Sequence, residues 1–235
     1  RRQSVQAQLR VRQVMSRHCP PACGCTITPW ALSEPLDFPK PDAAVRQELF
    51  GTARLTVLYS GTIGYAHDIG PFLQLARECR RRGLDIAFCF AGYGNTYQAQ
   101  LSQVTAEDSN IRLAGFADES ELERRLAAAD IHLISLREGW EGLVVPSKFF
   151  GALAIGRPVL FQGSEKSDIA QWVREFSLGD VLTSANQEEV VGQLRAYLKD
   201  PEKLRQDQMH ARDIYQEHFS KERMLEKFQQ VLAEL

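Results

Sequence analysis

Three consecutive residues near the middle of the chain, Pro146, Ser147 and Lys148, could together hold an anion. Proline suits the start of a helix because it has no N–H group to leave unpaired. The stretch "LVVPSKFFGALAIGRPV" therefore predicts a helix that starts at Pro146 and ends near Gly156. The N–H groups of Ser147 and Lys148 would point out of the helix start, where the helix dipole favours negative charge. This start predicts a phosphate or diphosphate site; the alternative is an ordinary helix start with a surface lysine.

Two glycine-rich stretches earlier in the chain could form other parts of a ligand site. They are "SGTIGYAHD", residues 60–68, and "AGYGN", residues 91–95. Glycine lets a backbone approach a ligand closely, and both stretches directly follow an apolar run. Neither is the G-x-G-x-x-G fingerprint of dinucleotide-binding proteins, which disfavours a dehydrogenase.

The elements that must position these loops alternate along the chain. Helical patterns separate six short apolar runs, which are residues 54–61, 85–92, 110–116, 130–136, 157–163 and 179–185. Strands that alternate with helices predict parallel βαβ units, with a sheet buried on both faces. The right-handed crossover rule then gives a doubly wound, Rossmann-like α/β fold. In such a fold the ligand lies at the carboxyl ends of the strands, where the candidate loops are expected.

Polar residues that can cap helices precede several of the helical segments. Helices are expected over 69–82, 201–217 and 221–234, among others. The candidate caps are Asp68, Asp118 with Glu121, Asn186 with Glu189, and Ser220, and the two pairs have capping-box spacing.

Composition and charge exclude several classes of function. The 235 residues are 44% hydrophobic and 25% charged, as in globular proteins, and the formal net charge of -2 gives no sign of nucleic-acid binding. No apolar run reaches the roughly 18 residues of a membrane span. No signal peptide is visible either, so we expect a cytoplasmic protein.

The first 50 residues differ in character from the rest. Residues 1–17 predict a helix with five arginines, and no acid precedes Glu34. Such a helix could lie on the anionic inner face of a membrane, or it could be an ordinary helix with a solvated basic face. Residues 18–50 contain six prolines and predict a linker. The first residue is Arg1 and not methionine, so the chain could be a fragment of a longer protein.

The five cysteines fall into two groups. Cys79 and Cys89 lie in predicted core elements and are expected to be buried. Cys19, Cys23 and Cys25 lie close to His18, and this cluster is either a set of free thiols or a zinc site with unusual spacing. Free thiols of a cytosolic loop are the favoured interpretation.

The chain resembles the donor-binding half of the GT-B glycosyltransferases, and most closely the retaining group often called family 4. The segments that carry the resemblance are "VLYSGTIGYAHDI", "FAGYG", "GFADESELERRLAAADIHLIS" and "VVPSKFFGALAIGRPVL", in that order. The version with Pro-Ser-Lys resembles enzymes that build bacterial cell-surface polysaccharides. The resemblance covers about residues 25–235. It implies the C-terminal half of a GT-B fold, which is a Rossmann-like parallel sheet with helices on both faces.

The resemblance also implies which residues bind the donor. In the family, the first glycine loop faces the cleft between two domains and the second lies near the nucleotide. The turn after the next strand holds the base through its backbone, and the helix start binds the diphosphate. Those positions are occupied here, in order, by Gly61, Thr62 and Gly64; by Gly92 and Gly94; by Phe116 and Ala117; and by Val145, Pro146 and Ser147. Lys148 would add the charge that stabilises the leaving diphosphate.

The sequence departs from the family at two glutamates. The second of these, on the helix, normally holds the ribose hydroxyl groups, and its position is Gly151 here, while the first aligns with Leu143. Glu138 and Glu141, in a longer loop, are candidates to bind hydroxyl groups of the donor sugar, with Glu141 the nearer. The resemblance further implies an N-terminal acceptor domain, of which residues 1–50 would be a remnant with its linker. Residues 51–235 would be the donor-binding domain with its C-terminal helices.

These features predict a retaining glycosyltransferase that takes a sugar from a nucleotide diphosphate sugar, with a UDP-sugar as the commonest choice in the family. No metal and no cofactor are implied. A different possibility is a non-catalytic nucleotide-sugar-binding module that needs a separate acceptor domain. A third is an epimerase acting on a UDP-sugar, for which His67 and Asp68 are the adjacent candidates.

Overall fold

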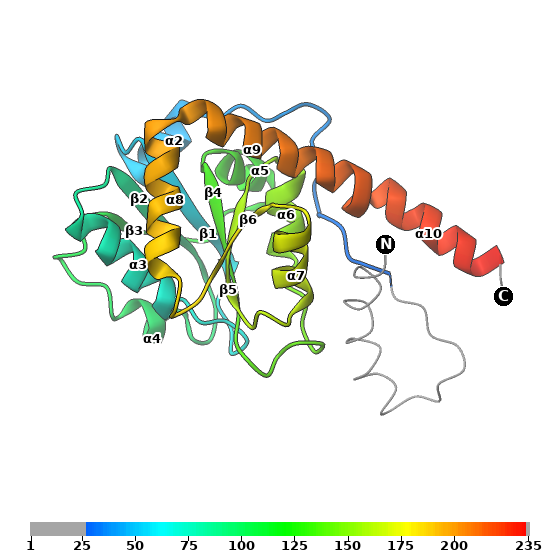
Figure 1. Ribbon diagram of the computed structural model, residues 1–235, viewed down its shortest axis with the longest axis horizontal. Coiled ribbons are helices and arrows are strands. Elements are labelled where there is room, and N and C mark those ends of the chain that lie inside the picture. The colour runs from blue at the N-terminus through cyan, green and yellow to red at the C-terminus, as the bar shows by residue number, and fades with distance from the viewer. Residues whose placement is uncertain (1–26, 234–235) are drawn as a thin grey trace.

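The computed structural model describes residues 27–233 and contains one parallel sheet (Figure 1). Its six strands have the order β3-β2-β1-β4-β5-β6. The strands are β1 Leu55–Thr62, β2 Ile86–Tyr93, β3 Ile111–Ala114, β4 Ile131–Leu136, β5 Val159–Gly163 and β6 Gly179–Leu182. Strands β1 and β2 are shifted by one residue from the predicted apolar runs. The other four strands lie inside the predicted runs. The doubly wound α/β fold is therefore confirmed.

Helices cover both faces of the sheet (Figure 1). They are α2 Ala43–Phe50, α3 Gly70–Arg81, α4 Tyr97–Leu101, α5 Glu119–Ala127, α6 Lys148–Ala154, α7 Asp168–Glu175, α8 Gln187–Lys199, α9 Pro201–Ile214 and α10 Lys221–Ala233. A π-helical turn, Tyr215–Phe219, joins the last two. Helices α3 and α8 pack on one face, and α2, α6 and α7 pack on the other.

The central strands are buried on both sides because successive side chains alternate between the two faces. In β1, Val57 and Tyr59 pack in the cluster with α3 and α8, while Leu58 between them packs in the cluster with α2. In β2, Phe88 and Cys89 divide in the same way. The expected burial of Cys79 and Cys89 is confirmed. Apolar residues on both faces explain why these strands appear in the sequence as continuous apolar runs.

Part of the region expected to be a linker is a helix that packs on the sheet. Residues 43–50 form α2, whose N-cap Asp42 accepts hydrogen bonds from the N–H groups of Ala44 and Val45. Arg46 of this helix forms a 2.7 Å ion pair with Asp130, next to β4. Apolar residues at its end, which the proline count does not reveal, explain why this helix belongs to the core. The division of the chain at residue 50 stays a prediction.

Residues 27–42 have no regular secondary structure but are tied to the C-terminal helices. The N–H of Ala31 donates to the Tyr215 hydroxyl at 3.0 Å. The Arg212 guanidinium donates to the carbonyl oxygens of Pro35 and Leu36. The predicted basic helix and the Cys19, Cys23 and Cys25 cluster lie outside the described residues.

Arg157, which follows α6, is fully buried and holds several chain segments together. Only 1% of its surface is exposed. Its guanidinium donates to the carbonyl oxygens of Ala127, Ala129, Ile155, Gly156 and Pro39. Burial lowers its pKa to about 10, so the group is charged at neutral pH. A side chain that looks like an ordinary surface residue in the sequence therefore lies in the core.

The two predicted capping boxes are wrong, although both helices begin where expected. Neither Asp118 nor Asn186 makes a side-chain capping bond. The Glu121 carboxylate pairs with Arg124 one turn along α5. The Asn186 side chain turns back to accept the N–H of Thr183. Other nearby donors therefore compete successfully for the groups that a capping box would use.

Other cap predictions are confirmed in part. The Asp68 carboxylate accepts the N–H of Gly70 at the start of α3, at 2.9 Å. The hydroxyl of Ser220 accepts the N–H of Arg223 at 3.4 Å. Ser220 thus separates the two C-terminal helices as expected.

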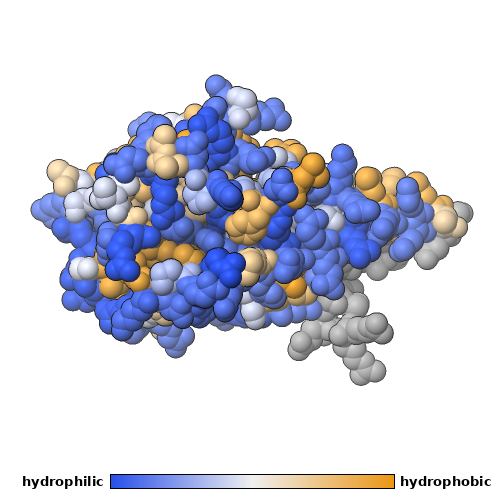
Figure 2. Space-filling model, turned by 90° about the horizontal axis from the view of Figure 1, so that it is seen from above, coloured by the Kyte–Doolittle hydropathy of each residue, from blue (hydrophilic) through white to orange (hydrophobic). Residues whose placement is uncertain are grey.

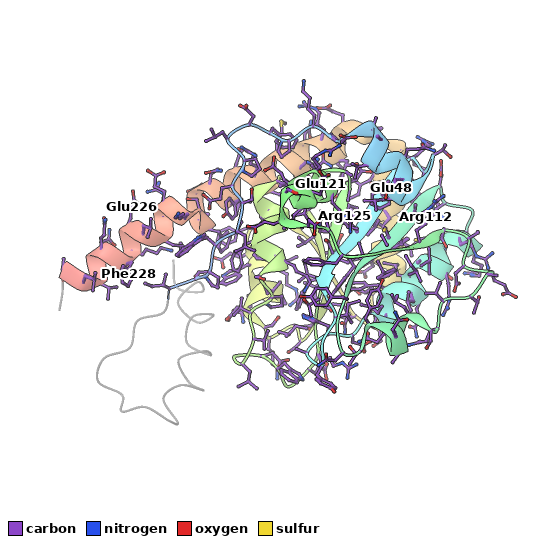
Figure 3. The ribbon with its side chains drawn as sticks, turned by 180° about the vertical axis from the view of Figure 1, so that it is seen from behind. Glu48, Arg112, Glu121, Arg125, Glu226 and Phe228 are labelled. Atoms are coloured by element: carbon purple, nitrogen blue, oxygen red, sulfur yellow. The ribbon has the colours of Figure 1, made fainter. Side chains whose placement is uncertain are left out.

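Helix α10 extends beyond the body of the molecule (Figure 1). It exposes Leu225, Phe228 and Leu232, and Figure 2 shows hydrophobic atoms on this protruding part. Figure 3 places Glu226 and Phe228 on the same extension. Within residues 27–233, no helix is long and apolar enough to cross a membrane.

Candidate functional site

A groove of about 350 Å³ lies between α5 and α6 and reaches the carboxyl ends of β1 and β2. Successive strands are added on one side of β1 and then on the opposite side of β4, so the topological switch point lies between β1 and β4. Ligands usually bind at this point in such folds. Six of the predicted site residues line this groove, namely Gly61, Thr62, Phe116, Ala117, Ser147 and Lys148. Residues that are distant in the sequence thus meet at the edge where the candidate loops were expected.

Lys148 is the main positive charge of the groove. Its ammonium group donates to the carbonyl oxygen of Thr62 at 3.0 Å and lies 5.4 Å from the centre of the Tyr59 ring. Burial lowers the pKa of Lys148 to about 8. The lysine therefore reaches across from α6 to the end of β1, where its charge is only partly solvated. A partly desolvated ammonium favours a negatively charged ligand.

Gly61 leaves the space that Lys148 occupies. Its φ is 119°, in the region that favours glycine, and a Cβ there would stand 2.8 Å from Cε of Lys148. A larger residue at this position would collide with the lysine. The glycine therefore permits the close approach of β1 and the lysine side chain.

The helix that was expected to start at Pro146 starts two residues later, at Lys148, with Ser147 as its N-cap residue. The carbonyl oxygen of Pro146 accepts the N–H of Phe149, which makes the first turn tight. Within residues 27–233, the N–H groups of Ser147 and Lys148 have no protein acceptor. The boundary was wrong, but the unpaired N–H groups at the helix start are as predicted.

An aromatic pair at the rim of the groove was not predicted. The rings of Tyr93 and Phe116 meet edge to face, with centroids 4.8 Å apart. Both side chains are about half exposed, at 52% and 59%, so they present aromatic surface to a ligand. Phe116 was predicted from the turn in which it lies, but no feature of the sequence predicted Tyr93 as its neighbour.

Comparison with known proteins identifies the family. The profile of a family described as glycosyl transferase-like matches residues 72–230, which is more than half of the chain. The chain belongs to this glycosyl transferase-like family. A curated relative from Pseudomonas aeruginosa, "Probable glycosyltransferase WbjE", is 27% identical over 156 residues. These residues make up 65% of this chain but only 38% of WbjE, so the chain spans well under half the length of that relative.

Solved structures of other proteins share the fold. HepE of Anabaena, in complex with UDP and glucose, matches with a TM-score of 0.70 at 13% identity, over 98% of this chain and 62% of HepE. The C-terminal domain of LpcC, a glycosyl transferase group 1 family protein of Francisella tularensis, has a TM-score of 0.59 at 14% identity. That match covers 77% of this chain and 96% of the LpcC domain. These likenesses agree with the expected Rossmann-like sheet of the C-terminal half of a GT-B fold.

Other predicted site residues of this glycosyl transferase-like chain do not line the groove. They are Gly64, Gly92, Gly94, Val145, Pro146, Glu138 and Glu141. Glu141 accepts the N–H of Gly139 at 2.8 Å, within the loop that follows β4. The proposed roles of these residues toward a donor stay predictions.

Gly92 and Gly94 have a structural reason to be glycine. A Cβ on Gly92 would stand 2.0 Å from the carbonyl oxygen of Gly61, and one on Gly94 would stand 2.3 Å from that of Ile63. Both glycines therefore allow the ends of β1 and β2 to lie close together. The resemblance placed these two residues near the nucleotide, while the structure shows them supporting the strand that carries Gly61.

We expect Gly92→Ala to lower the free energy of unfolding by about 1–3 kcal/mol, because the added methyl group must push β1 and β2 apart. Gly64→Ala is the matched control, since no atom of residues 27–233 outside Gly64 and its two chain neighbours lies within 4 Å of a Cβ there. It should change stability by less than about 0.5 kcal/mol. Urea unfolding of both variants measures the difference, and equal stability would show that the strand ends adapt without strain.

The adjacent pair His67 and Asp68 does not face the groove. His67 is buried, and its Nδ1 lies 2.9 Å from the carbonyl oxygen of Ser135. Burial, with a smaller contribution from Lys148, lowers the pKa of His67. The Asp68 carboxylate accepts the N–H of Gly70 at the start of α3. The geometry therefore does not favour an epimerase that uses this pair.

Proposed function

We propose that this chain is the donor-binding half of a retaining glycosyltransferase, which transfers a sugar from a nucleotide diphosphate sugar in bacterial cell-surface polysaccharide synthesis. Membership of the glycosyl transferase-like family supports the reaction class. The single observation that carries the proposal is the position of Lys148, whose ammonium group lies at the groove beside the unpaired N–H groups of the α6 start. The fold shared with HepE, which was solved with UDP and glucose, supports a UDP-sugar as donor.

In this proposal the groove binds the leaving group of the reaction. Negative charge grows on the diphosphate as its bond to the sugar breaks, and fixed positive groups stabilise that charge. Lys148 and the N–H groups of Ser147 and Lys148 take this role. Phe116 and Ala117 hold the base, and Glu141 or Glu138 binds hydroxyl groups of the donor sugar. The chain's own groups suffice for this step, so no cofactor is proposed.

The remainder of the reaction requires the acceptor to be aligned with the anomeric carbon. We assign this alignment to an N-terminal acceptor domain, in the same protein or a separate one. If that domain never joins a catalytic complex, the chain acts as a nucleotide-sugar-binding module. Contact with the inner face of a membrane is proposed on the sequence of residues 1–17 alone.

Calorimetric titration of the chain with UDP, GDP and ADP tests the donor site. We expect saturable binding of one of the three, which would also identify the base. Circular dichroism of the same sample confirms that the chain is folded. A folded chain that binds none of the three nucleotides would contradict the proposed site.

A further inference from the structure

The groove contains a carboxylate that the proposed function leaves unassigned. Glu123 of α5 is the one acid among the described residues that line it, and Lys148 is the one lysine or arginine. The remaining lining is apolar, aromatic or hydroxyl-bearing, apart from His132. Burial lowers the pKa of His132 to about 4, so this ring is neutral at pH 7. A ligand in the groove would therefore meet one cation and one anion.

Glu123 and Gly151 face the groove from opposite helices. Leu126, one turn beyond Glu123 on α5, lies 3.9 Å from where a Cβ on Gly151 would stand. Apart from the two chain neighbours of Gly151 and its own helix backbone, this is the single described atom within 4 Å of that point. Helix α6 therefore leaves open space at Gly151, on the side that faces the helix carrying Glu123.

Glu123 lines the same groove as the residues assigned to the base and to the diphosphate. Phe116 and Ala117 precede α5, and Glu123 lies about one turn, ~6 Å, beyond the start of that helix. Lys148 stands across the groove at the start of α6. With the base at the first position and the diphosphate at the second, the ribose must lie between them, because it joins the base to the phosphates.

The Glu123 carboxylate already accepts a hydroxyl group. Ser33, in the segment that covers the groove, donates its Oγ–H to Glu123 Oε2 at 3.2 Å. Both side chains are exposed, and the contact is long for an O–H···O bond. A ligand hydroxyl could therefore replace that of Ser33. Acidic side chains are the common acceptors for ribose hydroxyl groups in nucleotide-binding α/β folds.

We propose that Glu123 accepts hydrogen bonds from the ribose hydroxyl groups of the nucleotide donor. This inference rests on the proposed function, since it requires a nucleoside diphosphate in the groove. It assigns to α5 a contact with the sugar of the nucleotide, while α6 contributes the contacts with the diphosphate. Glu123 is then a binding residue that selects ribose over deoxyribose.

The test compares UDP with 2′-deoxy-UDP, and likewise for GDP and ADP, in titrations of the full chain. The unmodified chain should bind the ribonucleotide about tenfold more tightly, as expected for a hydrogen bond to a charged group. Glu123→Gln should lose most of that preference while keeping its affinity for the deoxynucleotide. Glu121→Gln is the matched control on α5, since Glu121, which is labelled in Figure 3, pairs with Arg124 and does not line the groove. It should keep the preference.

A second variant shows whether the position of the carboxylate matters. Gly151→Glu, added to Glu123→Gln, should restore part of the ribose preference, because open space at Gly151 faces the same part of the groove. A preference that survives in Glu123→Gln would overturn the inference and leave the donor site intact. The inference would also be overturned if Glu123→Gln weakened the binding of UDP-glucose but not that of UDP. That result would assign the carboxylate to the donor sugar. Failure of the unmodified chain to bind any nucleotide would instead overturn the proposed function.

Discussion

Lys148→Ala is expected to weaken the binding of a nucleoside diphosphate by tenfold or more. Tenfold corresponds to about 1.4 kcal/mol, which is modest for a charged contact in a partly desolvated site. The variant removes the ammonium group that reaches the end of β1 but leaves the backbone N–H groups of the helix start. Calorimetric titration gives the affinities. Lys199→Ala, on the exposed side of α8, is the control and should bind as the unmodified chain does.

The pH dependence of this affinity separates a charge effect from a packing effect. Lys148 has a pKa of about 8, so its ammonium group loses its proton as the pH rises above that value. Affinity for the diphosphate should therefore fall above pH 8 in the unmodified chain and stay level in Lys148→Ala.

The free energy of unfolding should increase over the same pH range. Between about 8 and 10.5 the unfolded chain binds more protons at this lysine, so stability rises with pH there. If the affinity for the diphosphate depended on pH in the same way in the unmodified chain and in Lys148→Ala, the role of the charge would be refuted.

Arg157→Met is expected to produce the largest loss of stability, about 3–5 kcal/mol. The substitution removes the donors for carbonyl oxygens in three chain segments and leaves those of Ala129 and Ile155 buried without this donor. It also removes the side chain that covers the Phe38 ring, whose centre lies 5.4 Å from the guanidinium carbon. Urea unfolding followed by circular dichroism measures the change.

The control for this prediction is an arginine with an ordinary surface role. Arg205 is exposed and pairs with Glu202 one turn away on α9. Arg205→Met should change the free energy of unfolding by less than about 1 kcal/mol. If Arg157→Met were equally mild, methionine would fill the space and water would satisfy the carbonyl oxygens, and the bonding role of Arg157 would be wrong.

The strands could be predicted because their signal is local. Strands such as β2 are buried on both faces, so every residue from Ile86 to Ala91 is apolar and buried. Lys148 could be predicted for a similar reason, since the proline before it marks a helix start. The start of α6 was predicted at Pro146 but lies at Lys148, because Pro146 belongs to a tight turn that directly precedes the helix.

The rest of the site depends on contacts between distant segments, which local patterns do not contain. Glu123 looks like one of several acids on an amphipathic helix, and its position in the groove follows from the packing of α5 beside α6. Tyr93 becomes part of the rim through its contact with Phe116. The role of Gly92 depends on a carbonyl oxygen of another strand, which no spacing within "AGYGN" reveals.

The order of the strands also bears on how fast the chain can fold. Strands β1 to β3 are neighbours in sequence and space, as are β4 to β6, but the two groups join through β1 and β4. That junction pairs Val57 with Ile131 and Leu58 with His132, and beside it Thr56 bonds to Asp130, 74 positions away. Closing so long a loop is slow because its entropy is lost before the contacts form. Each half of the sheet can therefore assemble early, and their union at β1 and β4 should limit the folding rate.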